Sequence, residues 1–145
     1  MLFRSEGFGP EVKRRIMLGT FALSAGYYDS YYGRAQAVRA KMRADFAEAF
    51  TRFDFLLTPT TPEPAFRIGA KADDPLAMYL SDIFTAPANL IGIPAIAVPS
   101  GFSREKLPLS LQIMAPHFAE RMMFRVGSFF EAETGYWKKL PPRRG

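Results

Sequence analysis

The chain has 145 residues, of which 48% are hydrophobic and 23% charged, and its net charge is +5 at pH 7. These proportions are typical of a globular domain with a core of its own and argue against a disordered chain. The sequence contains no cysteine and a single histidine, His117. Disulfides, a thiolate nucleophile and a zinc site built from several Cys or His side chains are therefore excluded within this chain.

No apolar run approaches the roughly 20 residues that span a bilayer, and the first six residues lack the apolar core of a secretory signal. We therefore expect a cytoplasmic protein without a membrane segment. The basic residues cluster only at the end of the chain, at Lys138, Lys139, Arg143 and Arg144. We interpret this tail as a solubilising segment, with contact to nucleic acid as the alternative.

Two helices are predicted in the first third of the chain. Pro10 suits the first position of a helix, and the pattern is helical over residues 11–23, up to the breaker Ser-Ala-Gly at 24–26. A longer helix is predicted over residues 27–50, because its apolar residues recur at steps of three and four. This stripe, which we expect to pack in the core, consists of Tyr28, Tyr31, Ala35, Val38, Met42, Phe46 and Phe50.

Three short strands are predicted at residues 53–58, 93–98 and 109–114, with Pro59 and Pro99 ending the first two. Asp73 and Asp74 favour a helix start at Pro75, and residues 87–94 are predicted to be a connection punctuated by glycine and proline. A last amphipathic helix is predicted over residues 118–133. Its expected inward residues are Phe118, Met122, Val126, Phe129 and Phe130. This order implies an α/β or α+β layered fold, in one domain over residues 1–145.

Pattern alone identifies no catalytic centre, since the sequence has neither a Gly-x-Ser-x-Gly elbow nor a glycine-rich phosphate loop. His117 precedes a predicted helix, where we expect a partly exposed side chain. Two other residues are candidates for binding. Arg15 has the planar guanidinium that suits a carboxylate, and Asp82 is a carboxylate in an otherwise apolar segment. Together they would suit a free α-amino acid, although both also have the simpler interpretation of solvent-exposed charges.

Several long motifs resemble those of one known family. They are Gly-Phe-Gly-Pro-Glu-Val-Lys-Arg-Arg-Ile-Met-Leu-Gly-Thr at 7–20, Ser-Ala-Gly-Tyr-Tyr-Asp at 24–29, Pro-Thr-Thr-Pro at 59–62, Asp-Asp-Pro-Leu-Ala-Met-Tyr at 73–79, Asp-Ile-Phe-Thr at 82–85 and Leu-Gln-Ile at 111–113. From about Ser5 to the final helix, the chain resembles the C-terminal portion of the A subunits of aspartyl/glutamyl-tRNA amidotransferases, which belong to the amidase signature family.

The resemblance implies a large mixed sheet with helices on both faces, of which this chain would hold only the C-terminal part. It implies a glutaminase activity, in which a triad of two serines and a lysine releases ammonia from glutamine. A partner, the B subunit, would use ATP and Mg²⁺ to convert Glu-tRNA(Gln) and Asp-tRNA(Asn) to Gln-tRNA(Gln) and Asn-tRNA(Asn). A small C subunit would brace the complex.

No serine or lysine of this chain matches the catalytic triad, so the resemblance assigns it no catalytic residue, and we expect no cofactor or metal on this chain. What the resemblance does imply is substrate binding, by Arg15 to the glutamine carboxylate and by Asp82 to the glutamine amino group. Ser81 and Ser110 depart from the asparagine and glycine that are common at these positions in the family.

The resemblance begins close to Met1. We therefore expect a fragment or a truncated reading frame that is inactive by itself. Two alternatives stay open. The chain would be the corresponding part of a general amidase with another amide substrate, or a non-catalytic binding or scaffold module.

Overall fold

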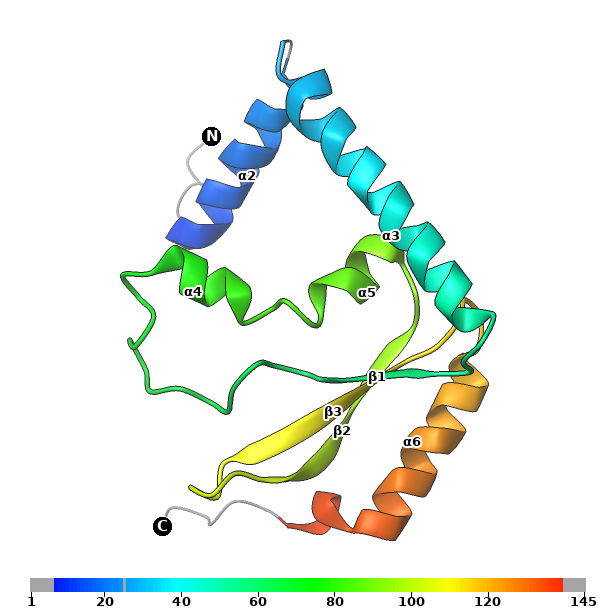
Figure 1. Ribbon diagram of the computed structural model, residues 1–145. Coiled ribbons are helices and arrows are strands. Elements are labelled where there is room, and N and C mark those ends of the chain that lie inside the picture. Colours follow the sequence, from blue (N-terminus) through cyan, green and yellow to red (C-terminus); the bar gives the residue numbers. More distant parts are fainter. Residues whose placement is uncertain (1–6, 25, 140–145) are drawn as a thin grey trace. The chain divides into compact units, whose positions relative to one another are not determined.

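The computed structural model describes residues 7–24 and 26–139 (Figure 1). The chain forms two compact units, one up to Lys41 and one from Met42 onward, and each is described here by itself. The prediction of a single domain stays a prediction. Arg143 and Arg144, at the end of the basic tail, lie outside the described residues.

The first unit is a pair of helices joined by a short π-helical turn. Helix α2 spans Pro10–Ala22, the π-helix η1 spans Tyr28–Gly33, and α3 begins at Arg34 and runs to Phe50, into the second unit. The ring centroid of Phe21 in α2 lies 4.3 Å from that of Tyr27 and 6.2 Å from that of Tyr31. Both predicted helices are confirmed, but the second begins with a π-helical turn.

The expected burial of the apolar stripe on the long helix is only partly correct. Met42, Phe46 and Phe50 are half-buried, whereas Tyr28, Tyr31, Ala35 and Val38 are exposed. The spacing of apolar residues identified the helix, yet within the described residues the first half of its stripe stays exposed, even though Tyr31 contacts Phe21. A periodic pattern shows that a face is apolar, but it does not show which element covers that face.

The second unit contains a three-stranded antiparallel sheet in the order β1-β3-β2. Its strands are β1 (Leu56–Pro59), β2 (Ala95–Phe102) and β3 (Pro108–Met114), with Ile113 paired to Leu57 on one side and to Ile96 on the other. Strand β2 continues past Pro99 through a register shift between Pro99 and Gly101, so the predicted end at Pro99 is wrong. A proline is tolerated there because β2 is an edge of the described sheet and is bulged at that point.

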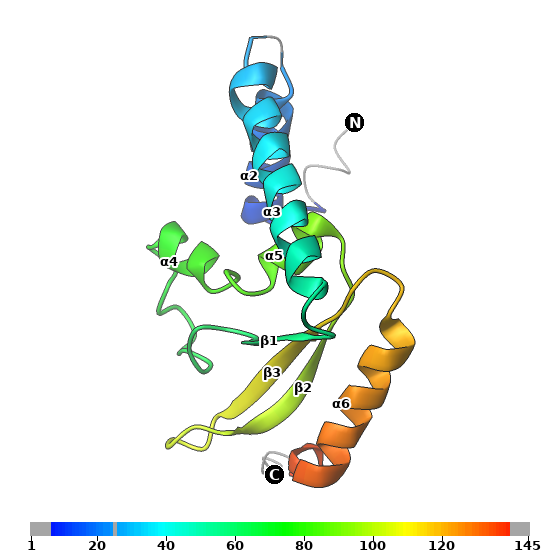
Figure 2. The same ribbon diagram turned by 45° about the vertical axis from the view of Figure 1, so that its right-hand side comes forward.

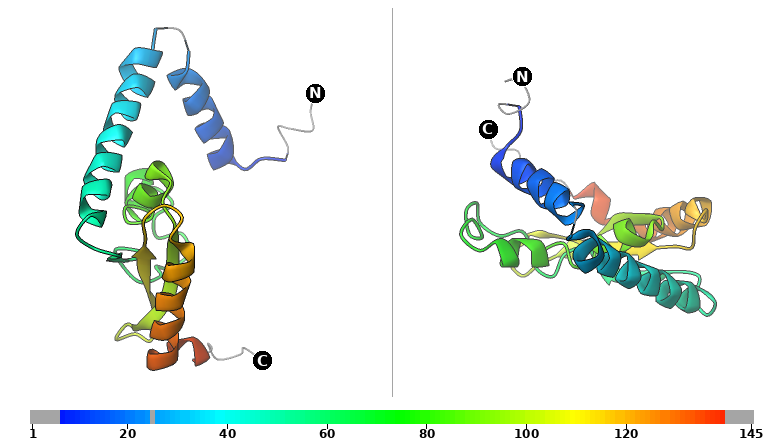
Figure 3. Two further views of the ribbon diagram at one scale, coloured as in Figure 1. Left: turned by 90° about the vertical axis from the view of Figure 1, so that its right-hand side faces the viewer. Right: turned by 90° about the horizontal axis from the view of Figure 1, so that it is seen from above.

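Helix α6 (Glu120–Thr134) packs against one face of the sheet, alongside β2 (Figures 2 and 3). The buried core between them consists of Val98, Ile113, Ala115 and Met123, with Phe55, Ile96, Leu111, Ala119, Val126 and Phe130 packed around it. Of the predicted inward residues, Val126 and Phe130 pack against the core. Phe118, Met122 and Phe129 are exposed instead, and Met123 and Gly127 are buried.

The segment before β2 lies over the opposite face of the sheet. Successive strand residues point to opposite faces, so Gln112 faces away from the core residue Ile113, and its side-chain Nε2 donates a hydrogen bond to the Phe84 carbonyl at 2.8 Å. The sheet thus carries helical segments on both faces, and the predicted α/β class is confirmed.

Two short helices connect β1 to β2. Helix α4 (Pro75–Leu80) begins where predicted, with Asp74 as its N-cap: the Asp74 carboxylate accepts a hydrogen bond from the Ala77 N–H at 2.9 Å. Helix α5 (Ala86–Ile91) replaces the predicted connection at residues 87–94. Pro87 lies in its first turn, where no N–H donor is needed, and Gly92 ends it with φ 81°.

A short 3₁₀ helix, η2 (Tyr136–Lys138), lies close to the end of the described residues and follows the left-handed residue Gly135. Among the described residues, no helix is both long and apolar enough to cross a membrane.

Candidate functional site

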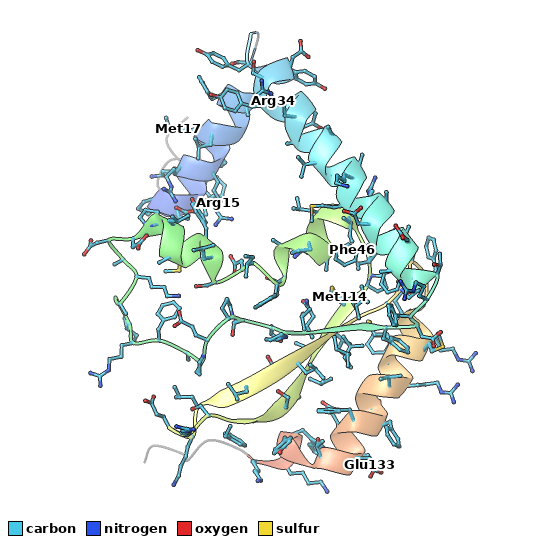
Figure 4. The ribbon with its side chains drawn as sticks, in the orientation of Figure 1. Arg15, Met17, Arg34, Phe46, Met114 and Glu133 are labelled. Atoms are coloured by element: carbon cyan, nitrogen blue, oxygen red, sulfur yellow. The ribbon has the colours of Figure 1, made fainter. Side chains whose placement is uncertain are left out.

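Arg15 lies on α2 in the first unit (Figure 4). Its Nε donates a hydrogen bond to Glu11 Oε1 at 2.8 Å, and its side chain is 61% exposed. Arg14 contacts the other oxygen of the same carboxylate, with Nη2 2.8 Å from Oε2. An exposed i,i+4 pair contributes only about 0.3–0.5 kcal/mol. A ligand carboxylate that accepts two parallel hydrogen bonds would compete with Glu11 for this guanidinium.

Asp82 lies in the second unit, one residue after the α4 C-cap residue Ser81. Its main chain is fixed at both ends. The Asp82 N–H donates to the Tyr79 carbonyl at 3.1 Å, and its own carbonyl accepts from the N–H groups of Thr85 at 3.1 Å and Ala86 at 2.9 Å. The residue itself is exposed. A carboxylate on a fixed main chain at the surface suits an ammonium ligand, because little conformational freedom is lost when it binds.

Sequence reasoning missed Lys71, whose side chain is only 15% exposed. Its ammonium forms an ion pair with Glu63 and lies 2.8 Å from Ser81 Oγ, 3.5 Å from the Ala77 carbonyl and 4.3 Å from the centre of the Phe66 ring. These partners are spread over 19 positions of the sequence, from Glu63 to Ser81. No periodic pattern relates them, so only the structure brings them together.

A cavity of about 330 Å³ lies between α5 and the sheet. Its polar lining consists of uncharged side chains, from Thr60, Thr85, Asn89 and Gln112. Thr85 connects this cavity to Asp82 through the hydrogen bond between its N–H and the Asp82 carbonyl. Hydroxyl and amide groups of this kind suit a neutral polar group such as a carboxamide.

His117 is exposed and lies before α6, but the N-cap of that helix is Ala119. Its predicted exposure is thus confirmed. Within residues 7–24 and 26–139, no three His, Cys, Asp or Glu side chains lie close enough together to hold a metal ion.

Comparisons with known proteins agree with one another over most of the chain. The model of the amidase family matches residues 2–124. The chain is 56% identical over 138 residues to the A subunit of the glutamyl-tRNA(Gln) amidotransferase of Shouchella clausii (strain KSM-K16), covering 95% of this chain and 28% of that protein. It is 58% identical over 140 residues to the corresponding protein of Geobacillus kaustophilus (strain HTA426), covering 97% of this chain and 29% of that one. The chain thus spans less than a third of the length of these relatives.

Solved structures agree with the sequence comparisons. The A subunit of the glutamyl-tRNA(Gln) amidotransferase from Thermotoga maritima superimposes with a TM-score of 0.61 at 53% identity, over 78% of this chain and 25% of that one. A 6-aminohexanoate cyclic dimer hydrolase gives a TM-score of 0.67 at 22% identity, over 81% of this chain and 26% of that one, which shows the shared fold alone. The resemblance predicted from the motifs, to the C-terminal portion of the A subunits, is confirmed. The chain belongs to the amidase family.

Proposed function

We propose that this chain supplies glutamine-binding residues to the glutaminase subunit of a tRNA-dependent amidotransferase. The observation that carries the proposal is its 56–58% identity, over at least 95% of its length, to proteins named as the A subunits of glutamyl-tRNA(Gln) amidotransferases. The two candidate residues, Arg15 and Asp82, stand inside motifs that the resemblance assigns to substrate binding.

In this proposal Arg15 binds the α-carboxylate of glutamine and Asp82 binds its α-ammonium group. The exposed guanidinium of Arg15 and the fixed main chain of Asp82 support these roles. The uncharged cavity next to Thr85 supports a carboxamide as the third group to be bound. Hydrolysis itself would be carried out by a serine-serine-lysine triad that is not part of this chain.

The remaining parts of the proposal concern the complete complex. Ammonia from glutamine would pass to the B subunit, which uses ATP and Mg²⁺ to convert Glu-tRNA(Gln) or Asp-tRNA(Asn) to Gln-tRNA(Gln) or Asn-tRNA(Asn). The C subunit would complete the assembly, and the site of action would be the cytoplasm. The names of the relatives, which specify one component of an amidotransferase acting on glutamyl-tRNA(Gln), support this part.

A chimera tests the function directly. In it, this chain replaces the matching segment of the Geobacillus kaustophilus relative, which is 58% identical, and the complex is reconstituted with its other subunits. We expect glutamine-dependent ammonia release close to that of the unaltered relative. A folded, assembled chimera without glutaminase activity would refute the proposal.

Two substrate analogues separate the roles of the two residues in the chimera. Glutaric acid monoamide lacks the α-ammonium group of glutamine, and 4-aminobutanamide lacks its α-carboxylate. We expect Asp82→Asn to raise the KM for glutamine but not that for glutaric acid monoamide. We expect Arg15→Gln to raise the KM for glutamine but not that for 4-aminobutanamide.

The matched controls are Asp54→Asn and Arg104→Gln, which make the same chemical changes at exposed positions and should leave every KM unchanged. If Asp82→Asn and Arg15→Gln also leave the glutamine KM unchanged, the general amidase with another amide substrate becomes the better hypothesis.

A further inference from the structure

Lys71 makes more polar contacts than an ordinary surface lysine. Its side chain is 15% exposed, and a buried ammonium is costly unless its N–H groups find partners. An ammonium has three N–H donors. Around Lys71 they meet the Glu63 carboxylate, the Ser81 hydroxyl at 2.8 Å and the Ala77 carbonyl at 3.5 Å, while the Phe66 ring lies 4.3 Å away. Glu63 thus neutralises the charge, and the ring contributes a cation–π contact.

These contacts join a loop to the end of a very short helix. Helix α4 has six residues, none of them buried, and Ser81 is its C-cap. Isolated helices of this length are not stable in water, and α4 has no buried apolar side chain to hold it. The polar contacts of Lys71 with Ser81 and Ala77 therefore account for much of the placement of its last turn. A cation near that turn is also favourable with the helix dipole.

The hydroxyl of Ser81 extends the same network. It accepts a hydrogen bond from Lys71 and donates one to the Ala77 carbonyl at 3.1 Å. The next residue is Asp82, whose carbonyl then binds the N–H groups of Thr85 and Ala86. The direction in which Asp82 leaves α4 therefore depends on how the Ser81 side chain is held.

We propose that Lys71 is a positioning residue, which holds Ser81 and so fixes Asp82 for the α-ammonium group of the substrate. This assignment rests on the proposed function of Asp82. Lys71 does not bind the substrate itself, because its charge is matched by Glu63 and its N–H groups are directed to Glu63, Ser81 and Ala77.

The structural half of the proposal is tested on the 145-residue chain by hydrogen exchange. In Lys71→Met, we expect faster exchange of the Thr85 and Ala86 amides, which bond to the Asp82 carbonyl, while amides of β3 keep their rates. Lys106→Met is the matched control, because Lys106 is exposed in the turn after β2. Equal exchange in the two variants would overturn the proposal.

The functional half uses the chimera. Losing hydrogen bonds to a charged group costs enough to change binding about tenfold, so we expect Lys71→Met to raise the glutamine KM about tenfold with kcat changed less than about twofold. The KM for glutaric acid monoamide should not change, because that substrate has no ammonium group for Asp82 to bind. Lys71→Arg keeps the charge and the pair with Glu63. Its glutamine KM should therefore be close to that of the unaltered chimera.

The outcomes separate this proposal from the one it rests on. A chimera that hydrolyses glutamine, but in which Lys71→Met raises the KM for both substrates alike, overturns only the positioning role. A chimera without any glutaminase activity overturns the proposed function and, with it, the role of Lys71 in substrate binding. The combination of faster exchange and a rise in KM confined to glutamine supports both.

Discussion

Gln112 and Phe84 are joined across the sheet face opposite α6, by a hydrogen bond of 2.8 Å from Gln112 Nε2 to the Phe84 carbonyl. The same nitrogen lies 3.1 Å from Thr58 Oγ1, and Gln112 is only 4% exposed. One side-chain amide therefore connects the middle strand β3 to the edge strand β1 and to the segment that leads from Asp82 into α5. This segment carries a proposed binding residue, so Gln112 contributes both to stability and to the geometry of the site.

Replacing Gln112 by methionine keeps the size of the side chain and removes both hydrogen bonds. We expect Gln112→Met to lower the free energy of unfolding by about 1–3 kcal/mol, because the carbonyl of the half-buried residue Phe84 loses this donor. Urea unfolding followed by the fluorescence of Trp137, the single tryptophan, measures this. Gln36→Met is the control, since Gln36 on α3 bonds only locally, to the Tyr32 hydroxyl. A Gln112→Met midpoint equal to that of the unaltered chain would contradict the prediction.

Substitutions at Gly127 should raise or lower the stability of the fold, depending on the size of the new side chain. A Cβ atom there would lie 3.5 Å from both Ile96 Cδ1 and Val98 Cγ1, which is ordinary van der Waals contact. Gly127→Ala should therefore raise stability by about 0.5–1 kcal/mol through helix propensity. Gly127→Leu should lower it by about 1–3 kcal/mol through overpacking. Thermal or urea unfolding of both variants checks this, and a destabilising Gly127→Ala would show that α6 has no room for a methyl group.

The same glycine explains why the buried face of α6 was predicted only in part: Val126 and Phe130 do pack against the core. The other three residues of the predicted stripe, Phe118, Met122 and Phe129, are exposed. The buried face instead runs through Met123 and Gly127, where the missing side chain lets the helix approach β2. Hydrophobicity cannot identify a contact that depends on the absence of a side chain.

Proline was informative in three places and misleading in two. Pro10, Pro59 and Pro75 correctly marked element boundaries. Pro87 and Pro99 were taken to interrupt structure, but one lies in the first turn of α5 and the other at a bulge in an edge strand. The tertiary fold decides whether a strand lies at the edge of its sheet and at which residue a helix begins. Sequence patterns do not contain this information.

Some residues of the candidate site could be found from the sequence and others could not. Arg15 and Asp82 were noticed for their side-chain chemistry and their sequence setting, but only the resemblance of long motifs gave them a role in substrate binding. Lys71 was not identified, since its partners Glu63 and Ser81 come from separate segments. Contacts of this kind follow from the course of the loop, and only coordinates reveal them.

The N-cap of α4 offers a matched pair of adjacent carboxylates. Asp74 accepts the hydrogen bond from the Ala77 N–H, whereas Asp73 lies one residue before the cap and is exposed. We expect Asp74→Ala to cost about 1 kcal/mol of helix stability and Asp73→Ala to cost much less. Hydrogen exchange of the α4 amides measures the difference. Equal protection in the two variants would mean that the cap contributes nothing to α4.

Exposed apolar side chains on α2 predict self-association of the chain in solution. Ile16, Met17 and Leu18 are 53%, 72% and 56% exposed, and large exposed apolar side chains favour association. Light scattering coupled to size-exclusion chromatography should show a mass that rises with concentration. Met17→Glu should reduce that rise. A monomer at every concentration would contradict the prediction.

The 145-residue chain by itself is expected to release no ammonia from glutamine. Binding residues orient a substrate, but amide hydrolysis also needs an activated nucleophile and a group that transfers protons, and no serine or lysine of this chain matches the family triad. A coupled ammonia assay with increasing amounts of the pure chain tests this, with the complete chimera as the positive control. Ammonia release in proportion to the amount of chain would mean that a nucleophile within these residues has been overlooked. The Lys71–Ser81 pair, 2.8 Å apart, would be the first to test, by Ser81→Ala. Loss of that activity in Ser81→Ala would identify Ser81 as catalytic and would overturn the positioning role inferred for Lys71.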